Sequence, residues 1–198
     1  MKMNLPNRLT LLRVLMIPFF AVFMLLSLGG GDISVLRAGQ PDSFRIYRYL
    51  SCAVFCLASI TDFLDGQIAR RCNLVTDFGK FMDPLADKLL VCTALILLTA
   101  EGSLSAVAVI IIIAREFIIS GFRLIAADNG IVIAASWWGK FKTTSQMILC
   151  IVLILPKLPV MLGTAVVNIL TLIVILLTLI SLIDYMSKNI KVITDGGM

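Results

Sequence analysis

The chain has 198 residues, and 60% of them are hydrophobic, which gives a mean hydropathy of +1.03 that is typical of membrane proteins rather than of one soluble domain. The absence of histidine excludes histidine general bases, serine–histidine triads and most zinc enzymes. The net charge of +5 is modest and comes from scattered basic residues, which favours contact with anionic lipid or a phosphorylated substrate over nucleic acid.

Six apolar runs follow one another with short connections. Each is roughly 15 to 25 residues long, close to the length of about 20 residues that an α-helix needs to cross a bilayer. They do not show the alternation of polar and apolar residues that marks membrane β-strands. We therefore predict a single all-α integral membrane domain over 1–198, with transmembrane helices at 9–28, 48–69, 84–100, 104–126, 141–155 and 159–183.

The distribution of basic residues indicates how these helices are oriented. Such residues gather before the first run, around 70–88, around 123–142 and after the last run. The positive-inside rule then places both termini and the second and fourth connections in the cytosol. The connection at 29–47 disagrees, because it is assigned to the outside and yet carries Arg37 and Arg45. We accept this exception because the other connections agree.

Four aspartates between positions 62 and 87 form one pattern. Asp62 and Asp65 are three residues apart, so their carboxylates share one face of the second helix, and Gly66 leaves room on that face beside the backbone. Arg70 stays near the same face, which suggests an anion in contact with the site. A carboxylate at the centre of a membrane helix costs about +2.5 to +3.5 kcal/mol on insertion scales. A divalent cation relieves that cost and the mutual repulsion of the carboxylates.

The second pair, Asp83 and Asp87, is four residues apart and again lies on one helix face. Because Pro84 follows Asp83, we expect a helix to begin there, with Asp83 as its cap and Asp77 in the preceding loop. Helices with so short a connection are neighbours, so the four carboxylates converge. They suit two hard cations, Mg²⁺ or Mn²⁺, in a polar cavity on the cytoplasmic side. Either pair alone is more typical of a helix cap or a solvated face.

The full pattern also closely resembles the signature of the CDP-alcohol phosphotransferase family. It reads Asp62-x2-Asp65-Gly66-x2-Ala69-Arg70-x8-Gly79-x3-Asp83-x3-Asp87. The resemblance implies an integral membrane enzyme with six transmembrane helices, usually a homodimer. In that family two divalent cations assist an alcohol in displacing CMP from a CDP-linked lipid.

The resemblance also implies a role for each matching residue. The aspartates that would hold the two cations are Asp62, Asp65, Asp83 and Asp87. Asp87 would also accept the proton of the attacking hydroxyl, and a carboxylate base agrees with the absence of histidine. The residues that would contact the CDP-lipid are Asn7 and Thr10, near the start of the first run, and Gly66, Arg70, Thr76 and Gly79.

A second group of basic residues lies in and between the fourth and fifth runs and comprises Arg115, Arg123, Lys140 and Lys142. Buried cations in a membrane enzyme are candidates for function, and several cations beside hydroxyl groups suit a phosphate dianion. This group therefore predicts a pocket for a phosphorylated acceptor. The alternative is that Arg115 only pairs with Glu116 or with an acidic group elsewhere, and that the lysines extend along the helix toward the membrane surface.

Three segments that carry these features resemble the bacterial branch of the family that makes phosphatidylglycerophosphate, namely 4–13, 115–123 and 134–143. The resemblance covers nearly the whole chain, least clearly 29–47. It implies transfer of the phosphatidyl group from CDP-diacylglycerol to sn-glycerol 3-phosphate with release of CMP, a step toward phosphatidylglycerol and cardiolipin. The expected location is the bacterial cytoplasmic membrane, with several crossings and with the active site and both termini in the cytosol.

Three alternatives stay open. The acceptor alcohol within the family could instead be inositol phosphate, serine or phosphatidylglycerol. An intramembrane prenyltransferase also uses paired aspartates and Mg²⁺, but it needs two distant motifs and a longer chain. A divalent-cation transporter would place its carboxylates near the membrane midplane and often shows repeated halves, whereas these aspartates are expected at helix ends and the sequence shows no repeat.

Overall fold

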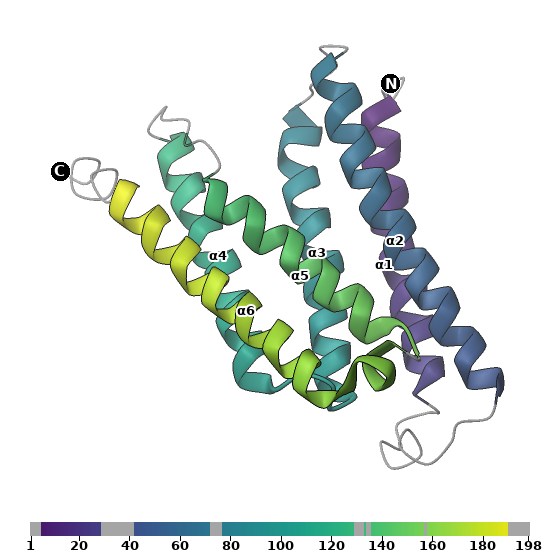
Figure 1. Ribbon diagram of the computed structural model, residues 1–198. Coiled ribbons are helices and arrows are strands. Elements are labelled where there is room, and N and C mark those ends of the chain that lie inside the picture. Colours follow the sequence, from purple (N-terminus) through teal and green to yellow (C-terminus); the bar gives the residue numbers. More distant parts are fainter. Residues whose placement is uncertain are drawn as a thin grey trace. The chain divides into compact units, whose positions relative to one another are not determined.

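The computed structural model describes residues 5–28, 42–71, 77–128, 133, 136–156 and 158–189. Within these ranges, the side chains at 5–6, 42–44, 63–71, 77–81, 83–84 and 127–128 lie outside the description. All regular structure in the described ranges is α-helical, which confirms the predicted all-α fold (Figure 1). The six helices are α1 (Leu5–Ser27), α2 (Asp42–Arg71), α3 (Asp77–Ala100), α4 (Ala106–Asp128), α5 (Trp137–Ile154) and α6 (Leu158–Asn189).

Contacts between residues divide the chain into two compact units. The first unit contains Met1–Ser103 and Cys150–Met161, and it therefore holds α1, α2, α3 and the end of α5. The second unit contains Leu104–Leu149 and Leu162–Met198, and it holds α4, the beginning of α5 and most of α6. The four aspartates of the motif belong to the first unit, and the basic residues of the predicted acceptor pocket belong to the second.

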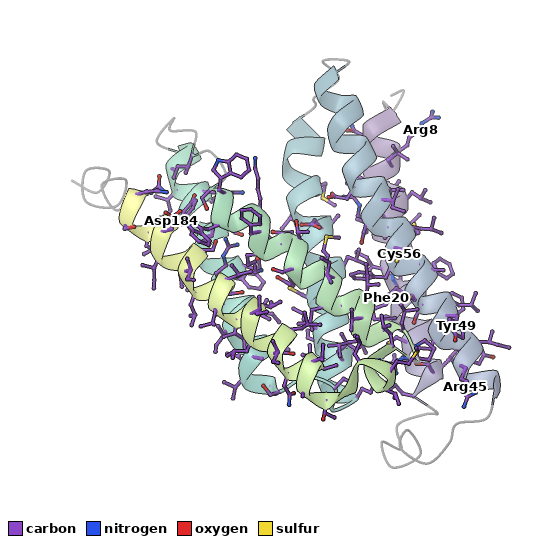
Figure 2. All side chains as sticks on the ribbon, viewed as in Figure 1. Arg8, Phe20, Arg45, Tyr49, Cys56 and Asp184 are labelled. Atoms are coloured by element: carbon purple, nitrogen blue, oxygen red, sulfur yellow. The ribbon has the colours of Figure 1, made fainter. Side chains whose placement is uncertain are left out.

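In the first unit, α1 packs along both α2 and α3. Phe20 of α1 and Phe55 of α2 are fully buried, with ring centroids 5.7 Å apart. Arg8, near the start of α1, and Arg45, near the start of α2, lie at opposite ends of the unit (Figure 2), so the two helices are antiparallel. The beginning of α1, the end of α2 and the beginning of α3 consequently share one end of the unit (Figure 1).

A glycine ends α3. Gly102 has a φ of 79°, in the left-handed region that glycine enters without steric cost. The N–H of Gly102 donates to the carbonyl of Thr99 at 2.9 Å, and the N–H of Ser103 donates to the carbonyl of Leu98 at 3.0 Å. These two bonds form a Schellman motif, which satisfies carbonyls that the helix leaves without partners. The sequence Glu101-Gly102-Ser103 therefore provides a well-formed carboxyl end for α3.

Arg48 connects α2 to the ends of two other helices. Its guanidinium pairs with the carboxylate of Glu101, directly after α3. The same group donates to the last two carbonyls of α5, with Nε 2.8 Å from the oxygen of Ile154 and Nη2 2.7 Å from the oxygen of Leu153. A cation at the carboxyl end of a helix also interacts favourably with the helix dipole. This buried cluster stabilises the end of the first unit that lies away from the aspartates.

In the second unit, α6 buries one face that carries both polar and apolar side chains. The buried residues of this face are Val174, Thr178, Ser181 and Tyr185, spaced as one stripe along the helix. Tyr185 packs against Ile119 and Phe122 of α4.

Nearer its start, α6 is interrupted at Gly163, whose φ of 78° and ψ of 156° are non-helical. Glycine makes this break accessible because it has no Cβ to clash with the backbone.

The beginning of α3 differs from the sequence-based prediction. The helix begins at Asp77, seven residues before Pro84, so the prediction that Asp83 caps a helix beginning at Pro84 is wrong. Asp77 belongs to the first turn of α3 and not to the preceding loop, and an acidic residue there is favoured by the helix dipole. Pro84 removes one helical hydrogen bond from α3, a loss that membrane helices tolerate better than soluble ones do.

Two stretches among the described residues are long and apolar enough to cross a membrane, Asn7–Ser27 in α1 and Leu158–Asn189, which is α6. Only 28% of the apolar window of α1 and 17% of that of α6 is buried within the protein. Apolar residues of these two helices, such as Phe19 of α1 and Ile183 of α6, are more than half exposed. Soluble monomers seldom expose so much apolar surface, so a lipid environment accounts for these helices.

Candidate functional site

The backbone brings the four aspartates of the motif to matched heights on α2 and α3. Asp65 lies six residues before α2 ends at Arg71, and Asp83 lies six residues after α3 begins at Asp77. Asp62 lies nine residues before the end of α2, and Asp87 lies ten residues after the beginning of α3. At about 1.5 Å per residue, Asp65 and Asp83 therefore lie roughly 9 Å along their helices from the connection between α2 and α3. Asp62 and Asp87 lie roughly 14 Å from it. Residues 72–76, which include Thr76, lie outside the described residues.

Asp62 forms an ion pair with α1. Its Oδ1 atom lies 2.6 Å from Nη1 of Arg13, whose side chain is fully buried, whereas the Asp62 side chain is 37% exposed. The carboxylate of Asp62 thus contacts a buried cation and remains partly accessible to solvent. Arg13 has no role in the sequence-based prediction. The helical spacing gives one signal for it, since Arg13 lies three residues after Thr10 and therefore on the same helix face.

The start of α1 supplies the predicted nucleotide contacts. Asn7 is partly buried, and Thr10 is 1% exposed and lies on the buried stripe of α1 that carries Arg13. This stripe begins at the end of the unit where α2 ends and α3 begins (Figure 1). Of the other predicted contacts, Gly66, Arg70 and Gly79 lie on described helix backbone, but their surroundings are outside the description.

The donor atoms on α2 and α3 fit hard divalent cations. Aspartate oxygens are the ligands that Mg²⁺ and Mn²⁺ prefer, and the side chains of Asp62 and Asp87 are partly exposed rather than sealed in the core. Among the residues whose side chains are described, no three acidic or cysteine residues lie close enough to hold a metal ion. Asp65 and Asp83 are outside that set, so the predicted group of four stays a prediction.

The second unit contains a buried polar cluster around Glu116 of α4. Its Oε1 atom pairs with Nζ of Lys142 on α5 and lies 3.1 Å from Nη1 of Arg115. Lys142 is 1% exposed and Arg115 is 7% exposed. Arg115 therefore forms the pair with Glu116 that the alternative to an acceptor pocket describes, whereas Lys142 does not extend to the surface as that alternative expects. One carboxylate thus joins two predicted acceptor-binding cations from two helices.

Helix α6 completes the surroundings of Arg115. Its Nη2 atom donates to the hydroxyl of Ser181, which is fully buried on α6. A Cβ placed on Gly139 of α5 would lie 3.4 Å from the same Nη2 atom, so glycine lets α5 come close to the guanidinium. Arg115 is therefore surrounded by α4, α5 and α6 within the second unit.

The remaining predicted cations lie at different distances from this cluster. Arg123 of α4 is close enough to Arg115 for their charges to interact, and its guanidinium carbon lies 5.9 Å from the ring centroid of Tyr185. Lys140 is exposed, and its amine lies 4.7 Å from the ring centroid of Trp137. The structure thus brings Arg115, Arg123 and Lys142 together. The amine of Lys140 instead lies over the exposed indole of Trp137.

These features define a helical protein with two apolar helices suited to a membrane, carboxylates suited to cations and a buried cationic cluster suited to an anion. The family model for CDP-alcohol phosphatidyltransferase matches residues 3–186, and the chain belongs to this family. The family is membrane-bound, in agreement with the two apolar helices.

Three relatives illustrate how far the similarity extends. The chain is 43% identical over 187 residues to a protein of Bacillus subtilis (strain 168), which covers 94% of this chain and 95% of the relative. It is 38% identical over 152 residues to a protein of Haemophilus influenzae, covering 75% and 74% of the two chains. It is 41% identical over 152 residues to a protein of Rickettsia typhi, covering 77% and 76%. All three relatives are called CDP-diacylglycerol--glycerol-3-phosphate 3-phosphatidyltransferase.

Proposed function

We propose that the chain transfers the phosphatidyl group of CDP-diacylglycerol to sn-glycerol 3-phosphate, which gives phosphatidylglycerophosphate and CMP. The observation that carries this function is the 43% identity, over nearly the full length of both chains, to a relative that bears the name of this activity. The enzyme therefore acts in phospholipid synthesis. The finer assignments of residues, metals, topology and oligomeric state are proposals that rest on the geometry and charges of each unit.

The motif aspartates form the metal-binding part of the proposed site. Asp62, Asp65, Asp83 and Asp87 hold two divalent cations, Mg²⁺ or Mn²⁺, with oxygen ligands from α2 and α3. When bound, such cations neutralise the pyrophosphate and stabilise the leaving CMP. This arrangement is supported by the similar distances of the α2 and α3 aspartates from the connection between the two helices. Arg13 orients Asp62 through the 2.6 Å ion pair and offsets part of the negative charge that four carboxylates concentrate.

Asp87 takes the proton of the attacking glycerol hydroxyl in this proposal. The chain has no histidine, and a carboxylate beside a metal-polarised hydroxyl can serve as the base for this step. The nucleotide contacts come from Asn7 and Thr10 of α1 and from four further residues of the motif segment, namely Gly66, Arg70, Thr76 and Gly79. The location of the start of α1 beside the end of α2 supports the contribution from α1 (Figure 1).

The acceptor phosphate binds in the second unit, at Arg115, Arg123, Lys140 and Lys142. Three of these cations lie together around one carboxylate, so Arg115, Arg123 and Lys142 with Glu116 carry a formal charge of +2. That charge balances a phosphate dianion, and buried cations bind anions more strongly than solvated ones do because less water screens them. Serine has no phosphate and would leave this charge unmatched.

The protein crosses the membrane several times in this proposal, with the active site and both termini in the cytosol of a bacterial cell. The exposed apolar surface of α1 and α6 supports crossing, and the distribution of lysine and arginine supports the orientation. Basic residues gather at 70–88 and at 123–142, so the positive-inside rule favours the cytosolic side for both of these segments. We also propose that the enzyme is a homodimer with one membrane domain per chain.

The decisive experiment offers the purified protein several acceptors in turn. CDP-diacylglycerol and Mg²⁺ are incubated with sn-glycerol 3-phosphate, inositol phosphate, serine or phosphatidylglycerol, and CMP release and lipid products are measured. We expect phosphatidylglycerophosphate with glycerol 3-phosphate and little turnover with the other alcohols. Turnover only with serine or inositol phosphate would reject the acceptor, and the absence of CMP release with every alcohol would reject the enzyme class.

A further inference from the structure

Tyr185 of α6 has a buried hydroxyl without a hydrogen-bond partner among the described residues. The residue is 2% exposed, and its ring meets that of Phe122 edge-on, with centroids 6.4 Å apart and planes at 87°. The guanidinium of Arg123 lies over the same ring. These contacts account for the ring of Tyr185 and leave its oxygen unexplained.

A phenylalanine would pack as well at this position. Burying a hydroxyl removes its hydrogen bonds to water, so a buried hydroxyl without a partner is less favourable than no hydroxyl at all. Buried polar atoms in folded proteins are nearly always bonded, and an exception calls for an explanation such as a ligand that provides the partner. The hydroxyl of Tyr185 therefore points to a function other than packing.

A second donor without a partner belongs to a neighbouring residue. Nε of Arg115 is buried and forms no hydrogen bond within the described part of the chain. Tyr185 and Arg115 are close enough to interact electrostatically, and Ser181, one helical turn before Tyr185, accepts a bond from Nη2 of Arg115. Two unsatisfied donors, one from α4 and one from α6, thus lie beside the same cationic cluster.

The kind of ligand follows from these two atoms. Both donate hydrogen bonds, and a ligand that satisfies them must offer at least two acceptor oxygens. The surrounding Arg123 and Lys142 are positive, so the ligand that they attract is an anion. A phosphate group meets both requirements, whereas a neutral alcohol such as glycerol or an ammonium group does not.

We propose that the Tyr185 hydroxyl and Arg115 Nε donate hydrogen bonds to the phosphate oxygens of the acceptor alcohol. Tyr185 is then a specificity-determining residue that distinguishes phosphorylated acceptors from neutral ones. This inference rests on the proposed function, because it places the phosphate of the acceptor in the cluster around Glu116. It adds a neutral donor from α6 to a site otherwise made of charged groups from α4 and α5.

The test replaces Tyr185 by phenylalanine, which removes one oxygen and keeps the ring. We expect the KM for sn-glycerol 3-phosphate to rise about tenfold, equivalent to about 1.4 kcal/mol of lost binding. The KM for CDP-diacylglycerol should stay within about twofold, and the melting temperature should stay equal or rise, because an unsatisfied buried group has been removed. The matched control is Tyr49→Phe on α2, where the tyrosine is 47% exposed and lies in the other unit.

A binding measurement separates this inference from the proposed function. The melting temperature of each protein is measured with glycerol 3-phosphate, inositol phosphate, inorganic phosphate and glycerol. The inference predicts that phosphate-containing ligands stabilise the wild type and the Tyr49→Phe variant more than they stabilise Tyr185→Phe, and that glycerol affects none of them. Stabilisation by inositol phosphate alone would reject the proposed acceptor and keep the role of Tyr185. Equal stabilisation of Tyr185→Phe and wild type, or none by any phosphate, would overturn the inference.

Discussion

The buried guanidinium of Arg13 on α1 lies 2.6 Å from the carboxylate of Asp62 on α2, the first aspartate of the motif. A fully buried cation normally needs a partner, and Arg13 finds one in a carboxylate that remains 37% exposed. The pair therefore connects the packing of α1 against α2 to the position of a proposed metal ligand. In the proposed function, this relationship makes the first helix part of the active-site structure.

Replacement of Arg13 by methionine tests that connection. The variant keeps most of the buried volume and removes the charge, so Asp62 loses the group that fixes its orientation. We expect kcat to fall at least tenfold and the dependence of activity on Mg²⁺ concentration to change. Activity across a Mg²⁺ titration and the melting temperature are the measurements. Arg8→Met is the control, because Arg8 is exposed on the same helix (Figure 2). An Arg13→Met enzyme with the wild-type Mg²⁺ curve would contradict the role of the pair.

The Asp87→Asn variant tests the proposed base. Asparagine has nearly the same shape but cannot accept a proton, so we expect CDP-diacylglycerol to bind while turnover falls by about 10² to 10⁴, the range typical of general-base catalysis. Binding is measured by protection against thermal unfolding, and turnover by CMP release. Asp184→Asn provides a control at a carboxylate that pairs with Lys188 on α6. Turnover of Asp87→Asn close to that of the control would assign the base to another group.

The sequence predicted the part of the site that depends on spacing along one helix. Asp62 with Asp65, and Asp83 with Asp87, are separated by three and four residues, so the helix period alone places each pair on one face. The helices themselves were also predictable, because long apolar runs have few alternative structures in lipid. The predicted start of α3 was wrong, since Pro84 reads as a helix start although the helix continues through it.

Contacts between helices were not predictable in the same way. Arg13 meets Asp62, and Glu116 meets Lys142, through packing angles and rotamers that no local pattern encodes. The sequence offered the pairing of Arg115 with its neighbour Glu116 as an alternative, but it gave no sign that Lys142 would share the same oxygen. The Tyr185 hydroxyl, which has no hydrogen-bond partner in the described part of the chain, is likewise recognised only when its surroundings are known.

Lys142 offers a test of the acceptor pocket. Replacing it by alanine removes a cation that is 1% exposed, and we expect the KM for glycerol 3-phosphate to rise at least tenfold while that for CDP-diacylglycerol changes little. Steady-state kinetics with each substrate varied in turn gives both values. Lys142→Met is a second variant that keeps more of the buried volume, and Lys188→Ala is the control at a side chain that is 65% exposed. Equal increases in both KM values would place Lys142 outside the acceptor pocket.

We predict that the buried ion pair of Arg48 with Glu101 stabilises the fold and takes no part in the reaction. Replacing Arg48 by methionine leaves the buried carboxylate of Glu101 without its cation and two carbonyls of α5 without their donor. We expect a loss of about 3 to 5 kcal/mol in the free energy of unfolding, the range typical of breaking a buried pair. Unfolding in detergent and KM values for both substrates are the measurements. The double variant Arg48→Met with Glu101→Gln should recover part of the loss, because it removes the unpaired charge. A change in either KM in the folded variant, or a single variant as stable as wild type, would contradict this separation of stability from catalysis.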